Sequence, residues 1–298
     1  MVLWTRLEQV DADLAGSASG GTTYLLIGSD ERVDVLEAER GRFGSARDVP
    51  GERADVVLLV RVTDSGAVRV LGVPRDLVLY RRSVGADRVT AMLRDGPGAI
   101  ADAICNSLGV GVSRAAVVHF AGLRDLVDLA GGVTVHSDEI VADRHSGLLL
   151  RSGANHLDGS RALAYVRARR IEVYRDGVVV PDPVRSAQRP QRAVEILRAV
   201  GSRLPIRWTN PIATHRLAWT AAGALTVDGG TGPFDLLELA DVLGRLPGGD
   251  PETLPVTRLG SDPPIDELDI DAWSLIDRFQ GSGTRPAACR RPALRPPA

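Results

Sequence analysis

The chain has 298 residues, of which 44% are hydrophobic and 25% charged, as is ordinary for a soluble globular protein with one large domain or two small ones. A net charge of −2 and an aromatic content of 4% argue against a nucleic-acid-binding protein, because they supply neither a basic surface nor stacking platforms. All 36 basic residues are arginines, so the number of arginines is weak evidence for a function. Only their positions in the chain can indicate a binding site.

The N-terminal part is predicted to be a lead-in followed by a first strand. Residues 1–20 begin with apolar side chains at helical spacing and end in a Gly- and Ser-rich joint. The chain contains no signal peptide or membrane span and starts abruptly, so we expect a missing N-terminal membrane anchor. Residues 22–27 form a predicted strand that leads into Asp30. Asp30 is either a ligand at a strand end, where α/β folds bind ligands, or a turn-forming residue.

Two apolar segments predict a buried hairpin. Residues 56–60 are an unbroken run of Val and Leu, and residues 67–73 supply a second strand after a turn. Asp55 lies at the start of the first strand, and Arg75 and Asp76 follow the end of the second. Because these two ends lie side by side in a hairpin, we expect carboxylates and guanidiniums to meet at one sheet edge. The alternative is a pair of surface salt bridges.

Alternating strands and helices follow and predict one layered α/β domain over residues 21–280. Helices are predicted over residues 99–108 and 120–130, strands over 112–118 and 133–135, and loops over 81–88 and 171–184. Residues 281–298 are rich in Gly, Pro and Arg and are predicted to be a disordered tail.

The two cysteines match no metal-ligand spacing. Cys105 falls in a predicted helix and is expected to be a small core residue, and Cys289 falls in the tail. The cysteines therefore do not show whether the protein works in a reducing or in an oxidising compartment.

Arginine placement points to an anion. Arg167 and Arg169 alternate in a segment predicted to be extended, so they would face one side. Arg185, Arg189 and Arg192 fall on one face of the first turns of a predicted helix. Cations there oppose the helix dipole, and a multiply charged anion would relieve the conflict. The alternative is a solvated arginine-rich face. Arginines bind phosphate oxygens, and the carboxylates of Asp30 and Asp55 suit Mg²⁺. Together, these residues predict a phosphate or pyrophosphate site.

Five motifs, taken in order, resemble the LytR-CpsA-Psr family. They are Leu25-Leu26-Ile27-Gly28-Ser29-Asp30-Glu31-Arg32, Arg53-Ala54-Asp55, Val73-Pro74-Arg75-Asp76, Leu163-Ala164-Tyr165-Val166-Arg167-Ala168-Arg169 and Arg189-Pro190-Gln191-Arg192. The resemblance covers roughly residues 21–205.

The resemblance implies a bacterial protein held by one N-terminal membrane helix, with its catalytic domain outside the cell. It implies a single α/β domain in which a mixed central β-sheet is sandwiched between α-helices, with a lipid chain in an apolar groove. The implied activity is Mg²⁺-dependent transfer of a glycopolymer from a polyprenyl-pyrophosphate carrier to peptidoglycan.

The resemblance also assigns roles to residues. Asp30 and Asp55 would hold Mg²⁺, and either could assist deprotonation of the acceptor. Asp55, Arg75 and Asp76 would be catalytic, with Asp76 orienting Arg75. The implied pyrophosphate ligands are Arg75, Arg88, Arg167, Arg169, Arg189 and Arg192.

The chain departs from the family pattern at three points. Arg88 stands near the place of the usual lysine, Ser186 stands in place of an aspartate, and the insertion between Asp30 and Asp55 is long. Two alternatives stay open: a hydrolase of lipid pyrophosphate, and a module that binds polyprenyl phosphate or an anionic glycan without chemistry.

Overall fold

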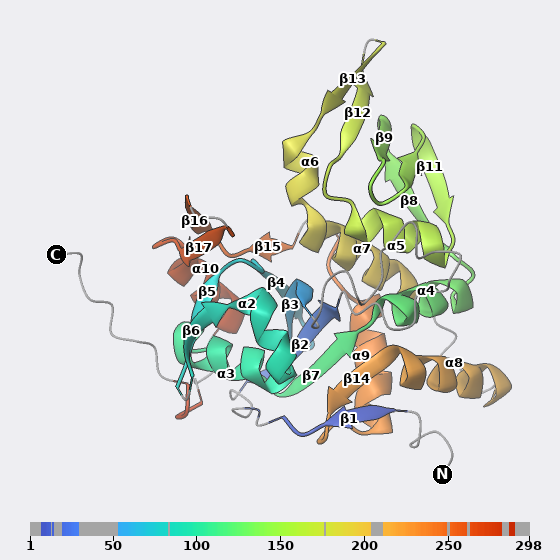
Figure 1. Cartoon of the computed structure of the whole chain (residues 1–298). Helices are drawn as coiled ribbons and strands as arrows, with labels where there is room; N and C mark the ends of the chain where they lie inside the picture. Colours follow the sequence, from blue (N-terminus) through green and yellow to red (C-terminus); the bar gives the residue numbers. More distant parts are fainter. Residues whose placement is uncertain are drawn as a thin grey trace.

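A mixed central sheet organises the computed structural model, which describes residues 7–12, 14, 20–29, 53–82, 84–175, 177–203, 211–248, 251–260, 263–281 and 286–289. In this described part, seven strands follow the order β1-β14-β7-β2-β3-β4-β15 (Figure 1). Their bounds are β1 (Glu8–Val10), β14 (Leu225–Asp228), β7 (Arg114–Val118), β2 (Gly21–Ser29), β3 (Ala54–Thr63), β4 (Val68–Val73) and β15 (Glu252–Thr253). The pairs β1–β14, β7–β2 and β4–β15 are parallel, and the others are antiparallel.

Helices cover both faces of this sheet. One face packs against α2 (Val89–Met92), the 3-10 turn η3 (Leu93–Asp95), α3 (Pro97–Leu108) and α10 (Ala272–Gln280). The other packs against α4 (Phe120–Leu129), α5 (Gly159–Arg167), α7 (Arg189–Gly201), α8 (Pro211–Ala224) and α9 (Pro233–Gly244). Residues that alternate along a strand go to opposite faces, as Leu26 and Ile27 of β2 do. The predicted mixed sheet between helices is confirmed.

The predicted hairpin is formed by β3 and β4. The two strands pair antiparallel from Val62↔Val68 to Val57↔Val73. β3 is buried along Ala54–Arg61 because both faces of the sheet are covered, which explains its continuous apolar sequence. Gly66 completes the turn with a left-handed φ of 82°.

A second sheet corrects the prediction of a loop over residues 171–184. Its strands are β10 (Leu148–Leu150), β9 (Ile140–Asp143), β12 (Glu172–Arg175) and β13 (Val178–Pro181), in that order, and the short helix α6 (Pro183–Ala187) follows. The β12–β13 hairpin projects at the top of Figure 1. The sequence signal for it is the Asp176-Gly177 pair between two short runs of β-formers.

Smaller two-stranded sheets complete the described fold, and the structure corrects two further expectations. The sheets are β5 (Val78–Arg81) with β6 (Gly85–Arg88), β8 (Val133–Ser137) with β11 (Gly153–Leu157), and β16 (Val256–Leu259) with β17 (Ile265–Leu268). The first lies where residues 81–88 were expected to be a loop. At the N-terminus, Glu8–Val10 is a strand of the central sheet, so the sheet extends into the predicted lead-in.

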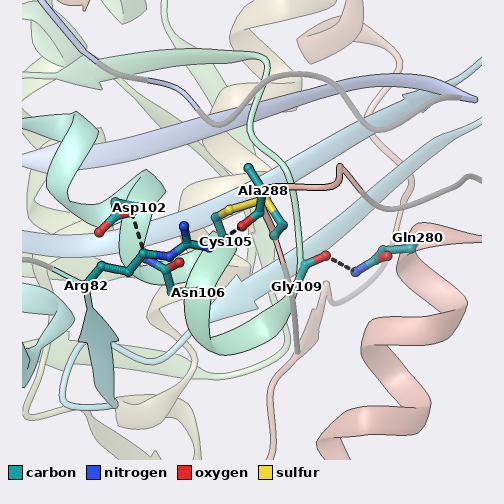
Figure 2. Close-up of a disulfide and its surroundings, with 8 residues drawn as sticks. Arg82, Asp102, Cys105, Asn106, Gly109, Gln280 and Ala288 are labelled. Atoms are coloured by element: carbon teal, nitrogen blue, oxygen red, sulfur yellow. Dashed lines mark hydrogen bonds between the residues drawn. A yellow bond between two sulfur atoms is a disulfide. The ribbon is translucent and has the colours of Figure 1, made fainter. Parts of the chain in front are cut away.

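A disulfide joins Cys105 of α3 to Cys289 across 184 residues (Figure 2). Next to it, Arg82 donates to the backbone oxygen of Ala288, and Gln280 donates to the backbone oxygen of Gly109. Residues 286–289 are therefore tied to the domain, which corrects the expectation of a wholly disordered tail. Cys105 is buried as expected, but as a cross-link. No helix within the described ranges is long and apolar enough to cross a membrane.

Candidate active site

Three arginines from separate parts of the chain converge on the carboxylate of Asp55. Nη1 of Arg75 donates to Oδ1 at 2.7 Å. Nη2 of Arg169 lies 2.9 Å from Oδ1 and 2.6 Å from Oδ2. Nη2 of Arg189 lies 2.8 Å from Oδ2. We call these four residues the Asp55 cluster.

Local structure explains how Asp55 and Arg75 meet. The register between β2 and β3 is continuous up to Gly28↔Val56 and then shifts, so that Ser29 pairs with Ala54 and Asp55 is the extra residue. Such a bulge re-aims the side chain that it carries. Arg75 follows the end of the neighbouring strand β4, so the hairpin places it beside Asp55, as the sequence predicted.

The cluster is an electropositive site with a buried carboxylate. The Asp55 side chain is 6% exposed, and three guanidiniums against one carboxylate leave an excess of two positive charges. Burial by itself would raise the pKa of Asp55, but the charges of Arg189, Arg169 and Arg75 outweigh it and hold the pKa well below its usual range. Burial lowers the pKa of Arg189, and Asp55 opposes this shift.

Asp76 is buried and contacts the cluster through Arg75. Its Oδ2 lies 3.5 Å from Nε of Arg75, and its Oδ1 lies 3.8 Å from Nη1 of Arg88. The structure therefore brings together Asp76, Arg75 and Arg88, all of which the resemblance placed in the site. The position of Asp76 fits the role of orienting Arg75.

Asp143 is a supporting residue that the sequence analysis missed. Its Oδ2 accepts the backbone N–H groups of Arg169 at 2.7 Å and Arg170 at 3.0 Å. Its Oδ1 accepts the N–H groups of His145 and Ser146. The segment after α5 is thereby fixed where Arg169 reaches Asp55. The sequence around Asp143 indicates only a local turn, and nothing in it points to Arg169.

The structure separates the three arginines that were expected on one helix face. Arg185 belongs to α6 and binds Glu139 at 2.7 Å. Arg192, on α7, is 5% exposed, and its three nitrogens donate to the backbone oxygens of Tyr165, Arg185 and Ala168. Of the three, the structure brings Arg189 to Asp55. The prediction that Arg192 binds pyrophosphate is corrected: its guanidinium ties α7 to α5 and α6.

An apolar cavity of about 50 Å³ adjoins the cluster. It lies between the central sheet and the helices α4, α5 and α7, and both Asp55 and Arg189 line it. Arg189, Ala193 and Leu197 are spaced four residues apart on α7, so they lie on one face of this helix. All three line the cavity, with Arg189 at the charged cluster and the two apolar residues beyond it.

Arg167 lies in the wall of the same cavity. Its guanidinium carbon stands 4.5 Å from the centre of the Phe120 ring, a cation–π contact. Arg167 is the last residue of α5, so the expected strand-like alternation with Arg169 does not hold at this point.

The donor set near Asp55 fits the Mg²⁺ that the resemblance implies. Asp55 supplies hard oxygen ligands beside arginines suited to phosphate, and Mg²⁺ is commonly held by one or two carboxylates together with substrate phosphates. Asp30, the second expected ligand, lies outside the described residues. Within those residues, no group of three His, Cys, Asp or Glu side chains is arranged to hold a metal by itself.

Known proteins resemble this chain in sequence. "Probable cell wall biosynthesis protein LcpB" of Corynebacterium glutamicum is 28% identical over 261 residues, covering 86% of this chain and 60% of the relative. The "polyisoprenyl-teichoic acid–peptidoglycan teichoic acid transferase TagU" of Bacillus cereus is 29% identical over 158 residues, covering 51% of this chain and 46% of the relative. The chain thus spans about half to three-fifths of these relatives.

Solved structures share the fold. The "LytR-Csp2A-Psr enzyme from Actinomyces oris" is 30% identical with a TM-score of 0.69, covering 93% of this chain and 97% of that one. A "LytR-CPS2A-psr family protein YwtF (TagT) with bound octaprenyl pyrophosphate lipid" is 18% identical with a TM-score of 0.59, covering 88% of this chain and 90% of that one, a likeness of fold alone. The LytR_cpsA_psr family model matches residues 5–177, more than half of this sequence. The chain belongs to the LytR_cpsA_psr family.

Proposed function

We propose that the protein is a Mg²⁺-dependent phosphotransferase that moves a glycopolymer from a polyprenyl-pyrophosphate carrier to peptidoglycan. One observation carries the proposal: a cluster of arginines around a buried carboxylate adjoins an apolar cavity. Guanidiniums bind phosphate oxygens bidentately, and the cavity suits a hydrocarbon chain. The names of the relatives, which refer to cell-wall biosynthesis and to teichoic acid transfer to peptidoglycan, support the same class of substrate.

The chain's own residues would bind and orient the donor. Arg75, Arg169 and Arg189 would neutralise the pyrophosphate oxygens, and the cavity would hold the first part of the lipid chain. Mg²⁺, bound by Asp55 together with phosphate oxygens, would supply further charge neutralisation.

The acceptor hydroxyl oxygen would attack the sugar-proximal phosphorus. The bond from this phosphorus to the bridging oxygen breaks, polyprenyl phosphate leaves, and the hydroxyl proton passes to solvent. Both carboxylate oxygens of Asp55 already accept hydrogen bonds from guanidiniums, so we assign Asp55 a charge-binding role rather than a deprotonating one.

Two features support the proposal that the protein acts outside the cytoplasm, at the membrane. The carrier lipid resides in a membrane, and the Cys105–Cys289 disulfide suits an oxidising compartment. Attachment to the membrane by an N-terminal helix stays a prediction.

The direct test incubates the purified protein with a short polyprenyl pyrophosphate and Mg²⁺ and follows polyprenyl phosphate by mass spectrometry. We expect release to fall on the order of 100-fold in each variant, because Asp55→Ala removes the carboxylate that would hold Mg²⁺ and Arg75→Ala removes a guanidinium that would bind the pyrophosphate. Arg94→Ala is the matched control, since Arg94 is a surface arginine paired with Asp87.

Repeating the assay with a glycan-linked polyprenyl pyrophosphate as donor, with and without a peptidoglycan-type acceptor, separates the remaining activities. A transferase joins the donor glycan to the acceptor through a phosphodiester and releases less free glycan phosphate, whereas a hydrolase gives the same products with or without the acceptor. Lipid bound without any release would instead identify a binding module.

A further inference from the structure

The N–H groups best placed for a pyrophosphate already bind a group of the protein itself. Arg75, Arg169 and Arg189 all direct terminal nitrogens at Asp55, at 2.6–2.9 Å. The Asp55 side chain is 6% exposed, whereas those of Arg75 and Arg169 are 31% and 50% exposed. The carboxylate therefore lies beneath guanidiniums that an incoming anion would meet first.

Asp55 disfavours a metal-free anion in two ways. A phosphate oxygen competes with the carboxylate for the same guanidiniums, and the two negative groups repel each other across a short distance in a partly buried site. If the guanidiniums turned fully to the anion, Asp55 would be left as a buried charge without compensation, which is strongly unfavourable.

A divalent cation removes both obstacles, because Asp55 is a suitable oxygen ligand for it. With the carboxylate neutralised by the metal, the guanidiniums are released to the phosphate oxygens. Arg189 has unused capacity for them: its Nε is buried and has no hydrogen-bond partner among the described residues.

We propose that Asp55 is a specificity residue that acts as an internal competitor and restricts the site to diphosphate accompanied by a divalent cation. This inference rests on the proposed function in taking the Asp55 cluster as the pyrophosphate site. It adds that metal and diphosphate bind cooperatively, each raising the affinity for the other by the same factor, because both act through the same carboxylate.

If Asp55 is instead an anchor for the arginines, its neutralisation should change the affinity for diphosphate in the opposite direction. If Asp55 only held the arginines in a conformation ready for the anion, neutralising it would loosen them and weaken the binding of diphosphate. The sign of the change in metal-free affinity therefore decides between a competitor and an anchor.

The experiment titrates inorganic pyrophosphate into the full chain by calorimetry, at fixed low ionic strength, once with EDTA and once with Mg²⁺. The variants are Asp55→Asn and the matched control Asp182→Asn. Asp182 also contacts two arginines, Arg175 at 3.7 Å and Arg185 at 3.5 Å, and it caps α6 in a way that Asn also permits. The control thus makes the same charge change outside the Asp55 cluster.

For the wild type and for Asp182→Asn, we expect Mg²⁺ to tighten pyrophosphate binding by about tenfold or more. For Asp55→Asn, we expect metal-free binding to become about tenfold tighter than in the wild type and to gain little from Mg²⁺. Metal-free binding that is unchanged or weaker in Asp55→Asn would overturn the proposal.

The wild type alone provides a second test, in case Asp55→Asn does not fold. Equal affinity for pyrophosphate in EDTA and in Mg²⁺ would also overturn the proposal. Failure of the proposed function looks different: the cooperative binding would be present, but polyprenyl pyrophosphate would not be converted. Absence of pyrophosphate binding in every variant and condition would reject both.

Discussion

The carboxylate of Asp143 accepts the backbone N–H of Arg169 at 2.7 Å, although 26 residues separate them. Through this bond, the last residue of β9 fixes the segment from which Arg169 reaches Asp55. Asp143 touches none of the phosphate-binding N–H groups that we assign, so it is a positioning residue.

Asp143→Asn is expected to destabilise the fold. An amide has one oxygen where the carboxylate has two, so its NH₂ group would face backbone N–H donors. We expect a loss of about 2 kcal/mol in the free energy of unfolding, measured by urea denaturation. Asp138→Asn is the control, because the Asp138 side chain is 90% exposed. Equal stability of the two variants would contradict the role of Asp143.

The same carboxylate predicts an acid-dependent stability. Burial opposes ionisation of Asp143, but the backbone N–H groups of Arg170, Arg169, His145 and Ser146 outweigh it and lower the pKa below its usual range. A lowered pKa in the folded state gives stability that is present above the unfolded pKa of about 4 and lost as the pH falls through the folded value. The stability gap between wild type and Asp143→Asn should therefore be full at pH 6–7 and should shrink below about pH 4. A gap that does not change with pH would refute this.

Arg189 and Arg192 are three residues apart on α7, yet we predict opposite consequences for their replacement by lysine. In Arg192→Lys, backbone oxygens of Tyr165, Arg185 and Ala168 lose donors, so unfolding should become easier by on the order of 3 kcal/mol. In Arg189→Lys, stability should change less, but pyrophosphate affinity should fall about tenfold, because lysine cannot donate bidentately. Denaturation and calorimetry on both variants check this, and similar profiles would contradict it.

The apolar cavity predicts a separation between lipid and phosphate binding. Ala193 is buried in the cavity wall, one helical turn beyond Arg189. Ala193→Phe should fill the cavity, at a folding cost of about 1–3 kcal/mol. Affinity for polyprenyl pyrophosphate should then fall, while affinity for inorganic pyrophosphate, measured in parallel, should stay the same. A parallel loss of both would mean that the cavity does not hold the lipid.

The disulfide predicts a redox-dependent stability. Joining Cys105 and Cys289 closes a loop of 184 residues, and long loops restrict the unfolded chain most. Replacing both cysteines with serine should lower the free energy of unfolding by about 3–5 kcal/mol and leave pyrophosphate binding unchanged. A reductant should destabilise the wild type and have no effect on the double variant. A wild type whose stability is unaffected by full reduction would contradict this.

Part of the active site follows from sequence because its geometry is local. The apolar strands and the turn between them fix the β3–β4 register, so Asp55 and Arg75 had to lie side by side. The resemblance supplied Arg169 and Arg189 as phosphate ligands, and their meeting at Asp55 depends on how α5 and α7 pack on the sheet.

Other features were decided only by the tertiary structure. Helical spacing grouped Arg192 with Arg189, but packing of α7 against the ends of α5 and α6 buries the Arg192 guanidinium among backbone oxygens. Nothing near Asp143 in sequence indicates that it binds the backbone of Arg169, and nothing in the tail indicates that Cys289 reaches α3. The physical reason is common to these cases: spacing along a strand or helix fixes the directions of neighbouring side chains, whereas contacts between distant segments are fixed by how whole elements pack.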